Sequence, residues 1–222
     1  NPEGPGDSLF AHKSMGAYDD QLHLYNTNHP DVHEVYRQFR SVLDEYDDPE
    51  RIAVGEIHFF DWPRWTAYFG EDGNEFHLPF NFHLLGVDWT APAVERAVNS
   101  LEAALPAGAC PNYVLGNHDE VRLASRLGEE NVRLAAMLLC SLRGTPTLYY
   151  GDELGLPEAD VPPDRRLDLQ EDGLDAQLTR DGCRTPMPWR DAPAAGFSEA
   201  DPEDLWLPVG EEHRDRSVER QV

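Results

Sequence analysis

The stretch YVLGNHDE, residues 113–120, indicates the fold more directly than any other part of the chain. Its apolar beginning has the composition of a buried β-strand that ends at Gly116. Three polar residues then follow in succession, namely Asn117, His118 and Asp119. Parallel β/α barrels present catalytic side chains in this way, at the carboxyl ends of strands that hold them rigidly. The stretch therefore predicts a parallel α/β fold with polar chemistry at a strand end.

A second strand upstream ends in the same way. The apolar residues 52–54 lead through Gly55 to Glu56, so a carboxylate again follows a strand. We expect the side chains of Glu56 and Asp119 to face one shared pocket and to take part in acid–base chemistry on a polar substrate. By residue type alone, both carboxylates could instead cap helices or bind arginines, with His118 a satisfied loop histidine, and this alternative stays open.

Strand and helix patterns alternate four times along the chain, which indicates βα units and a parallel sheet. The predicted strands are 52–54, 75–85, 113–115 and 147–150, and the predicted helices are 32–46 with Asp31 as N-cap, 93–105 and 131–143. Four units are half of an eightfold barrel, so we expect residues 1–154 to form a partial (β/α)8 barrel. Residues 155–222, rich in Pro, Asp, Arg and Gly, are expected to form an irregular excursion after the last strand.

The charge balance excludes whole classes of partner. The 222 residues include 42 acidic and only 18 basic side chains, which gives a net charge of −24. Such a chain repels nucleic acid and anionic membranes, so we expect neither as a partner. No window approaches eighteen apolar residues, and no signal peptide is visible, so we expect no membrane span. The odd number and wide spacing of the three cysteines favour a reducing, cytoplasmic location.

The sequence carries no recognisable metal or cofactor motif. Cys110, Cys140 and Cys183 are odd in number and form no CxxC pair, which argues against a zinc site or a disulfide framework. Cys140 lies in an apolar helical run and is predicted to be a small core residue. Glycine-rich phosphate loops are absent, and so is EF-hand spacing. We therefore expect no metal and no cofactor. The acids considered for calcium are Asp19, Asp20, Asp152 and Asp160.

Two carboxylates near aromatic residues suit cleavage of a glycosidic bond with retention of configuration. That reaction needs one carboxylic acid to protonate the leaving oxygen and one carboxylate to attack the anomeric carbon. Glu56 suits the acid role if nearby aromatic rings raise its pKa by desolvation. Asp119 would then hold sugar hydroxyls as the ring flattens. The aromatic residues in question are Phe59, Phe60, Trp62 and Trp65.

Several motifs resemble those of one enzyme superfamily. GNHD at 116–119 resembles the seventh-strand motif of the α-amylase superfamily of glycoside hydrolases, and VGE at 54–56 resembles its fifth-strand motif. GTPTLYYGDELGL at 144–156 is similar to its eighth strand and the following turn. DGCRTPMPW at 181–189 is similar to a segment found in the α-glucosidase and oligo-1,6-glucosidase branch of this superfamily. The resemblance covers nearly the whole chain and implies strands five to eight of the catalytic barrel.

The resemblance also implies roles for individual residues. Glu56 matches the general acid/base, and Asp119 matches the carboxylate that grips sugar hydroxyls in the transition state. His118 and Arg184 match residues that contact the terminal glucose, and Phe80, at the sixth-strand end, is expected to line the pocket. The implied activity is that of a retaining, exo-acting α-glucosidase, which releases terminal α-linked glucose from small oligosaccharides or disaccharides.

The departures from the family pattern are informative. The nucleophile segment, Gly-Phe-Arg-x-Asp, does not occur, and neither does the Asp-x-x-x-Asn-His pattern of the earlier strands. We therefore expect a fragment without the N-terminal half-barrel and the C-terminal β domain, inactive alone because the nucleophile is missing. Two other functions stay open. One is a transglycosylating relative of the sucrose isomerase or trehalose synthase type, and the other is a non-catalytic scaffold like the heavy chains of amino-acid transporters.

Overall fold

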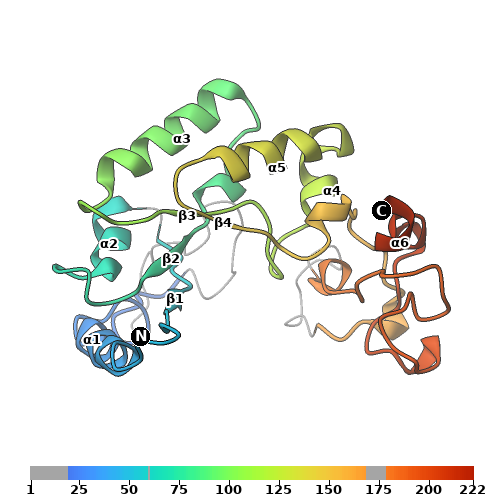
Figure 1. The fold of residues 1–222 in the computed structure, drawn as a ribbon, viewed down its shortest axis with the longest axis horizontal. Helices are drawn as coiled ribbons and strands as arrows, with labels where there is room; N and C mark the ends of the chain where they lie inside the picture. The colour runs from blue at the N-terminus through green and yellow to red at the C-terminus, as the bar shows by residue number, and fades with distance from the viewer. Residues whose placement is uncertain (1–19, 60, 169–178) are drawn as a thin grey trace. The chain divides into compact units, whose positions relative to one another are not determined.

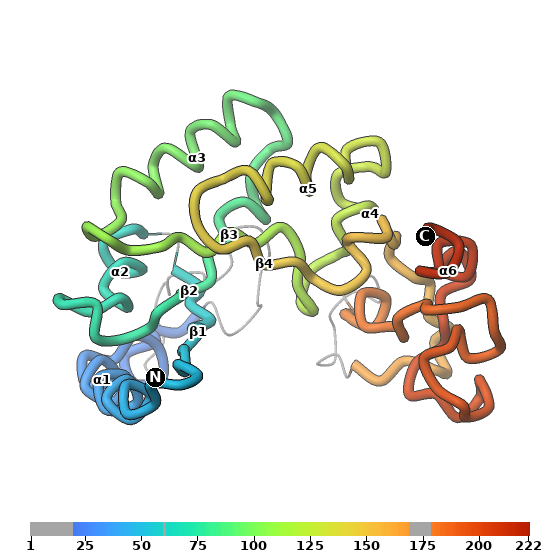
Figure 2. Tube along the Cα trace, in the orientation of Figure 1, coloured from blue at the N-terminus to red at the C-terminus, as the bar shows by residue number. Residues whose placement is uncertain are grey.

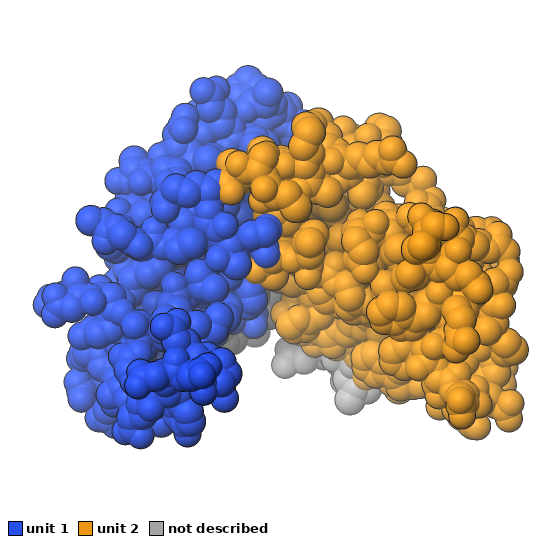
Figure 3. Space-filling view, viewed as in Figure 1, with its two compact units in different colours: residues 1–114, 143–146 blue, residues 115–142, 147–222 orange. Residues whose placement is uncertain are grey.

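The computed structural model describes residues 20–59, 61–168 and 179–222. The chain divides into two compact units (Figure 3). Residues 1–114 and 143–146 form the first unit, and residues 115–142 and 147–222 form the second. No described helix has both the length and the apolar character that a membrane span requires.

A four-stranded sheet has the strand order β1-β2-β3-β4 (Figure 1). The strands are β1 (Val54–Gly55), β2 (Leu78–Asn81), β3 (Asn112–Val114) and β4 (Thr145–Thr147). β2 is parallel to both of its neighbours: Val54 pairs with Leu78, and Phe80 pairs with Asn112. Sequential strands that are parallel must be joined by crossovers, here helical ones. The predicted α/β fold with a parallel sheet is thus confirmed.

The core of the first unit lies along β3, whose three residues are all buried. Val114 packs with Phe82 and Leu85 in one apolar cluster, with Phe80 against its edge. Strands buried on both faces are typical of parallel sheets covered by helices. The helices of this unit are α1 (Val32–Leu43), α2 (Trp62–Thr66) and α3 (Ala91–Ala104).

Helix α1 is fastened to the rest of its unit by a buried carboxylate. The side chain of Glu75 is only 2% exposed, and it accepts from His33 Nδ1 at 2.7 Å and from Arg37 Nη1 at 3.0 Å. Arg40 donates to the backbone carbonyl of Gly73 at 2.6 Å. None of the residues of α1 is itself buried, so these polar contacts are a principal attachment of the helix.

The second unit contains the helices α4 (Leu123–Leu127), α5 (Val132–Ser141) and α6 (Val218–Gln221). After Gly155, the described residues form short 3-10 turns joined by extended segments, and α6 is the α-helix among them. The orange-to-red part of the trace accordingly bends every few residues (Figure 2). Side-chain hydrogen bonds to backbone groups therefore carry much of the order in this region.

Several element boundaries differ from those predicted. The last strand, predicted at 147–150, was misplaced: β4 ends at Thr147, and the hydroxyls of Tyr149 and Tyr150 both donate to the carbonyl of Cys183. The predicted strand at 75–85 is extended only in β2, because a 3-10 turn follows it. Asp31 is the N-cap residue of α1, as predicted, although its side chain makes no capping hydrogen bond.

Candidate functional site

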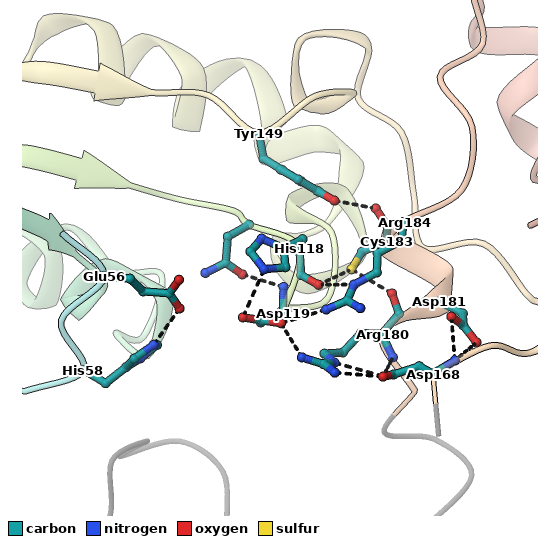
Figure 4. A network of polar contacts seen from close by, with 11 residues as sticks. Glu56, His58, His118, Asp119, Tyr149, Asp168, Arg180, Asp181, Cys183 and Arg184 are labelled. Carbon is teal, nitrogen blue, oxygen red and sulfur yellow. Dashed lines mark hydrogen bonds and ion pairs between the residues drawn. The ribbon is translucent and has the colours of Figure 1, made fainter. Parts of the chain in front are cut away.

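Glu56 is the first residue after β1, and a neighbouring histidine holds its carboxylate. His58 Nε2 lies 2.7 Å from Glu56 Oε1 (Figure 4). The His58 ring stacks on Phe82, with 4.9 Å between centroids and 25° between the planes. The side chain of Glu56 is 43% exposed. The carboxylate is therefore oriented by a ring that packs on the core, and it remains accessible to solutes.

The aromatic residues after Glu56 contribute to the core of the first unit. Trp65 is fully buried, and its indole N–H donates to the backbone carbonyl of Phe80 at 3.0 Å. Phe80 is half-buried and stacks on Phe82, with 5.7 Å between centroids. Because Glu56 is so exposed, the predicted aromatic enclosure around it is not found among the described residues; Phe60 lies outside them.

In the second unit, Asp119 binds two arginines through one oxygen. Arg180 Nη1 lies 2.6 Å from Oδ1, and Arg184 Nη2 lies 2.9 Å from the same atom (Figure 4). His118 Nε2 lies 3.5 Å from the other oxygen, Oδ2. The backbone N–H of Asp119 donates to Asn117 Oδ1 at 2.9 Å, so Asn117 braces the turn that presents the carboxylate.

These cationic neighbours decide the charge of Asp119. Burial acts to raise the pKa of Asp119, but the hydrogen bond from Arg180 and the surrounding positive charges outweigh it. The net result is a pKa below the usual value of the carboxyl group. Asp119 is therefore ionised at neutral pH. Such a group can accept hydrogen bonds and stabilise positive charge, but it cannot serve as a proton donor there.

Arg184 contacts the turn at two points. Its Nε donates to the carbonyl of His118 at 2.8 Å, while its Nη2 reaches Asp119. The thiol of Cys183 also donates to the His118 carbonyl, at 3.4 Å. Residues 183–184 therefore fix the backbone of the strand-end turn as well as the carboxylate that it carries.

The segment that carries Arg184 is itself held by a buried arginine. Arg122 is 1% exposed, and its Nη2 donates to the Cys183 carbonyl at 2.8 Å. The hydroxyl of Tyr149 donates to the same carbonyl at 3.0 Å (Figure 4). The guanidinium of Arg122 also lies over the ring of Tyr150, 4.8 Å from its centroid. One carbonyl thus collects donors from segments that are far apart in the sequence.

A family model described as the alpha amylase catalytic domain matches residues 10–222. The chain belongs to the alpha-amylase family. A protein named "Probable alpha-glucosidase" from Rhizobium meliloti (strain 1021) is 37% identical over 221 residues, covering 92% of this chain and 38% of that protein. A human amino acid transporter heavy chain is 32% identical over 209 residues, covering 92% of this chain and 29% of the heavy chain.

A solved structure gives the same family assignment. The crystal structure of an alpha-glucosyl transfer enzyme, XgtA, superposes with a TM-score of 0.82 at 35% identity, covering all of this chain and 42% of that one. The chain therefore has the fold of the alpha-amylase catalytic domain, over less than half the length of these relatives. The relatives thus include a protein named as a probable alpha-glucosidase and a transporter heavy chain.

In this member of the alpha-amylase family, the structure brings together three of the site residues that were predicted from the sequence. His118, Asp119 and Arg184 are in mutual contact within the second unit. Glu56 and Phe80 belong to the first unit and lie on or directly after its strands. Residue type alone left open that Asp119 binds arginines, and it does bind two of them. This contact is compatible with the expected role of Asp119 in holding sugar hydroxyls.

Two residues of the Asp119 network were missed by the sequence analysis. Arg180 donates to Asp119, and Asp168 binds Arg180 through both carboxylate oxygens. The only sequence signal was the position of Arg180 directly before the family segment 181–189. Asp168 had none, because nothing in one sequence relates an acid at 168 to a turn at 119.

The described residues contain no group of three or more His, Cys, Asp or Glu side chains arranged to hold a metal ion. All three cysteines are free thiols. Cys183 is buried, and burial raises the pKa of its thiol to about 12. Cys140 is exposed, so its predicted place in the core is wrong: it lies on the open face of α5.

Proposed function

We propose that the chain is the C-terminal half of the catalytic barrel of a retaining, exo-acting α-glucosidase. In this proposal β1 to β4 are barrel strands five to eight, residues 1–154 form the half-barrel, and residues 155–222 form the excursion after it. The proposal draws on the family match over residues 10–222 and on the 37% identity to the bacterial relative named as a probable alpha-glucosidase.

The observation that carries the proposal is the cationic setting of Asp119. Cleavage of a glucoside passes through an oxocarbenium-like state, in which positive charge develops on the sugar ring. A carboxylate that stays ionised stabilises this charge and accepts hydrogen bonds from sugar hydroxyls. Arg184 and His118, which contact Asp119, are proposed to bind the same glucose unit.

Glu56 is proposed as the general acid and base. It follows β1 directly, is accessible, and has one oxygen engaged by His58. In the first step it would protonate the leaving oxygen, and in the second it would deprotonate the attacking water. Phe80, at the carboxyl end of the neighbouring strand, is proposed to line the glucose pocket. The aspartate nucleophile would come from a part of the barrel outside these 222 residues.

Transfer to a sugar acceptor is the second candidate, because the solved relative at 35% identity is titled an alpha-glucosyl transfer enzyme. Hydrolysis and transfer differ only in which acceptor reaches the glucosyl intermediate. A non-catalytic scaffold, as in the transporter heavy chain, is less well supported. The relative at 37% identity is named as a probable alpha-glucosidase, whereas the heavy chain is 32% identical.

The test uses the longer protein that is proposed to contain this chain. Wild type should release glucose from maltose, and Asp119→Asn should lower kcat/KM by about 10²–10⁴-fold. Glu56→Gln should impair maltose far more than p-nitrophenyl α-glucoside, because p-nitrophenolate leaves without a proton. Asp191→Asn is the matched control, since Asp191 also binds an arginine.

Two outcomes would contradict the proposal. If the enzyme converted sucrose to an isomeric disaccharide and released no glucose, its reaction would be glucosyl transfer and not hydrolysis. Full activity on maltose in both Asp119→Asn and Glu56→Gln would remove the proposed roles altogether.

A further inference from the structure

Asp168 and Asp181 link the segments 167–168 and 180–181, because the carboxylate of each aspartate accepts backbone N–H groups of the other segment. Asp181 is 2% exposed, and its carboxylate accepts the backbone N–H groups of Leu167 at 2.8 Å and of Asp168 at 3.1 Å. In return, Asp168 accepts the backbone N–H of Arg180 at 2.9 Å. Each segment thus supplies a carboxylate to the backbone of the other. This exchange fixes the position of the Arg180 main chain.

The side chain of Arg180 then bridges two carboxylates. Its Nε and Nη2 donate to the two oxygens of Asp168 at 2.9 and 2.8 Å, and its Nη1 donates to Asp119 at 2.6 Å (Figure 4). The planar guanidinium is the group whose geometry permits a two-point contact on one side and a further contact on the other. A lysine ammonium is a compact point charge and lacks this fixed fork of donors.

We propose that Arg180, held by Asp168, is a positioning residue that orients the carboxylate of Asp119 for glucosyl cleavage. The inference rests on the proposed function, in which Asp119 acts on the transition state. Neither Arg180 nor Asp168 touches the reacting atoms in this scheme, so neither is a catalytic residue.

Exposure explains why Arg180 needs the second aspartate. The Arg180 side chain is 42% exposed, and an arginine so open to solvent ordinarily samples many rotamers. Three hydrogen bonds to Asp168, one from the backbone and two from the side chain, restrict it before any substrate arrives. The pKa of Asp168 is lowered to about 2, chiefly by the hydrogen bond from Arg180, so the pair stays charged.

The orientation of Asp119 depends on contacts to one oxygen. Arg180 and Arg184 both donate to Oδ1, while His118 lies near Oδ2. Without Arg180, Asp119 loses one of the two arginine donors to Oδ1, and its carboxylate gains freedom to rotate. Misplacement of a reacting group by about 1 Å can cost on the order of 10²-fold in rate.

The kinetic test uses the longer enzyme. We expect Asp168→Asn and Arg180→Lys each to lower kcat by about 10–100-fold while KM changes by less than about 3-fold. A lower kcat with a nearly unchanged KM indicates a contact that stabilises the transition state and does not contribute to ground-state binding. Arg220→Lys is the matched control, because Arg220 also bridges two aspartates, Asp191 at 2.7 Å and Asp215 at 3.0 Å, and is 45% exposed.

A second readout needs no activity. In the 222-residue chain, Arg180→Gln should raise the pKa of the Asp119 carboxyl, measured by ¹³C NMR titration, and Arg220→Gln should leave it unchanged. An unchanged Asp119 titration in Arg180→Gln would overturn the inference, whatever the enzyme does.

The two proposals fail in different ways. If wild type is active, Asp119→Asn is impaired, and Asp168→Asn and Arg180→Lys match Arg220→Lys, the positioning role is wrong and the proposed function stands. If wild type shows no activity on α-glucosides, the proposed function fails, and the reaction-specific role of Arg180 fails with it even where the NMR shift is found.

Discussion

Asp119 and Asp152 belong to the same unit, yet their surroundings move their pKa values in opposite directions. Asp119 is kept ionised by the positive charges around it. Asp152 is 6% exposed, and burial raises its pKa to about 6 against the opposing charges of Arg122 and Arg126. Since the carboxyl of Asp152 is shut off from solvent, its protonation should affect stability and not chemistry.

The sign of this effect follows from the folded and unfolded pKa values. Because the folded value, about 6, lies above the ordinary value of 3.8, protonated Asp152 stabilises the folded state below about pH 4. The contribution is lost as the pH rises through about 6. A difference of this size corresponds to roughly 3 kcal/mol.

Asp152→Asn should remove this dependence. We expect the stability of wild type relative to Asp152→Asn to fall by roughly 2–3 kcal/mol between pH 4 and pH 7, as measured by urea unfolding. Taking the difference cancels the titration of every other group. Asp160→Asn, at an exposed position, is the control. A constant difference across this range would show that Asp152 does not titrate in it.

Single residues also mark the limit of sequence reasoning. His118 and Asp119 could be predicted because a strand, a glycine and a polar run are adjacent in sequence. Arg180 and Asp168 could not, since Arg180 lies 61 positions after Asp119, and only the fold brings these two into contact. Arg184, the other arginine partner of Asp119, was found only because it lies in the family segment 181–189.

At the level of elements, the strand ends were predicted better than the strands. Glu56 follows β1 as expected, and the GNHD turn follows β3. The sequence predicted a strand at Tyr149 and Tyr150 because aromatic residues are common in strands. Their hydroxyls instead bind the Cys183 carbonyl, a partner that strand propensity cannot reveal.

The entry into β4 depends on a glycine that no other residue can replace without strain. Gly144 has φ = +117°, and an added Cβ would lie 2.2 Å from the carbonyl oxygen of Pro111. Thr145, the next residue, donates its N–H to that same carbonyl at 2.9 Å. A shift of the chain to relieve the clash would therefore disturb the hydrogen bond that begins β4.

Gly144→Ala should thus destabilise the protein by about 3 kcal/mol or more, as measured by urea unfolding. Gly108→Ala is the matched control: Gly108 also has a positive φ, +83°, but an added Cβ would meet nothing within 4 Å. It should cost roughly 1–2 kcal/mol from backbone conformation alone. Equal losses in the two variants would show that the Pro111 contact contributes nothing.

At the level of the whole molecule, two helices present apolar side chains to solvent. Phe39 on α1 is 59% exposed, and Met137 on α5 is 63% exposed. The helical periodicity correctly located both helices, but it could not show whether anything covers their apolar faces. Open apolar faces are typical of surfaces that another part of a fold covers, which agrees with the proposed half-barrel.

The proposed division of the barrel makes a prediction about the chain as it stands. Glu56 and Asp119 are both retained, but no segment of the nucleophile type occurs in the 222 residues. Without the covalent glucosyl intermediate, retaining cleavage has no first step. We therefore expect the purified chain, shown to be folded by near-UV circular dichroism, to give no turnover of p-nitrophenyl α-glucoside above the buffer blank. Asp119→Asn, purified in the same way, identifies contaminating glucosidase, because equal rates in both preparations cannot come from this site. A rate present in wild type and lost in Asp119→Asn would show that these residues cleave glucosides without the missing aspartate.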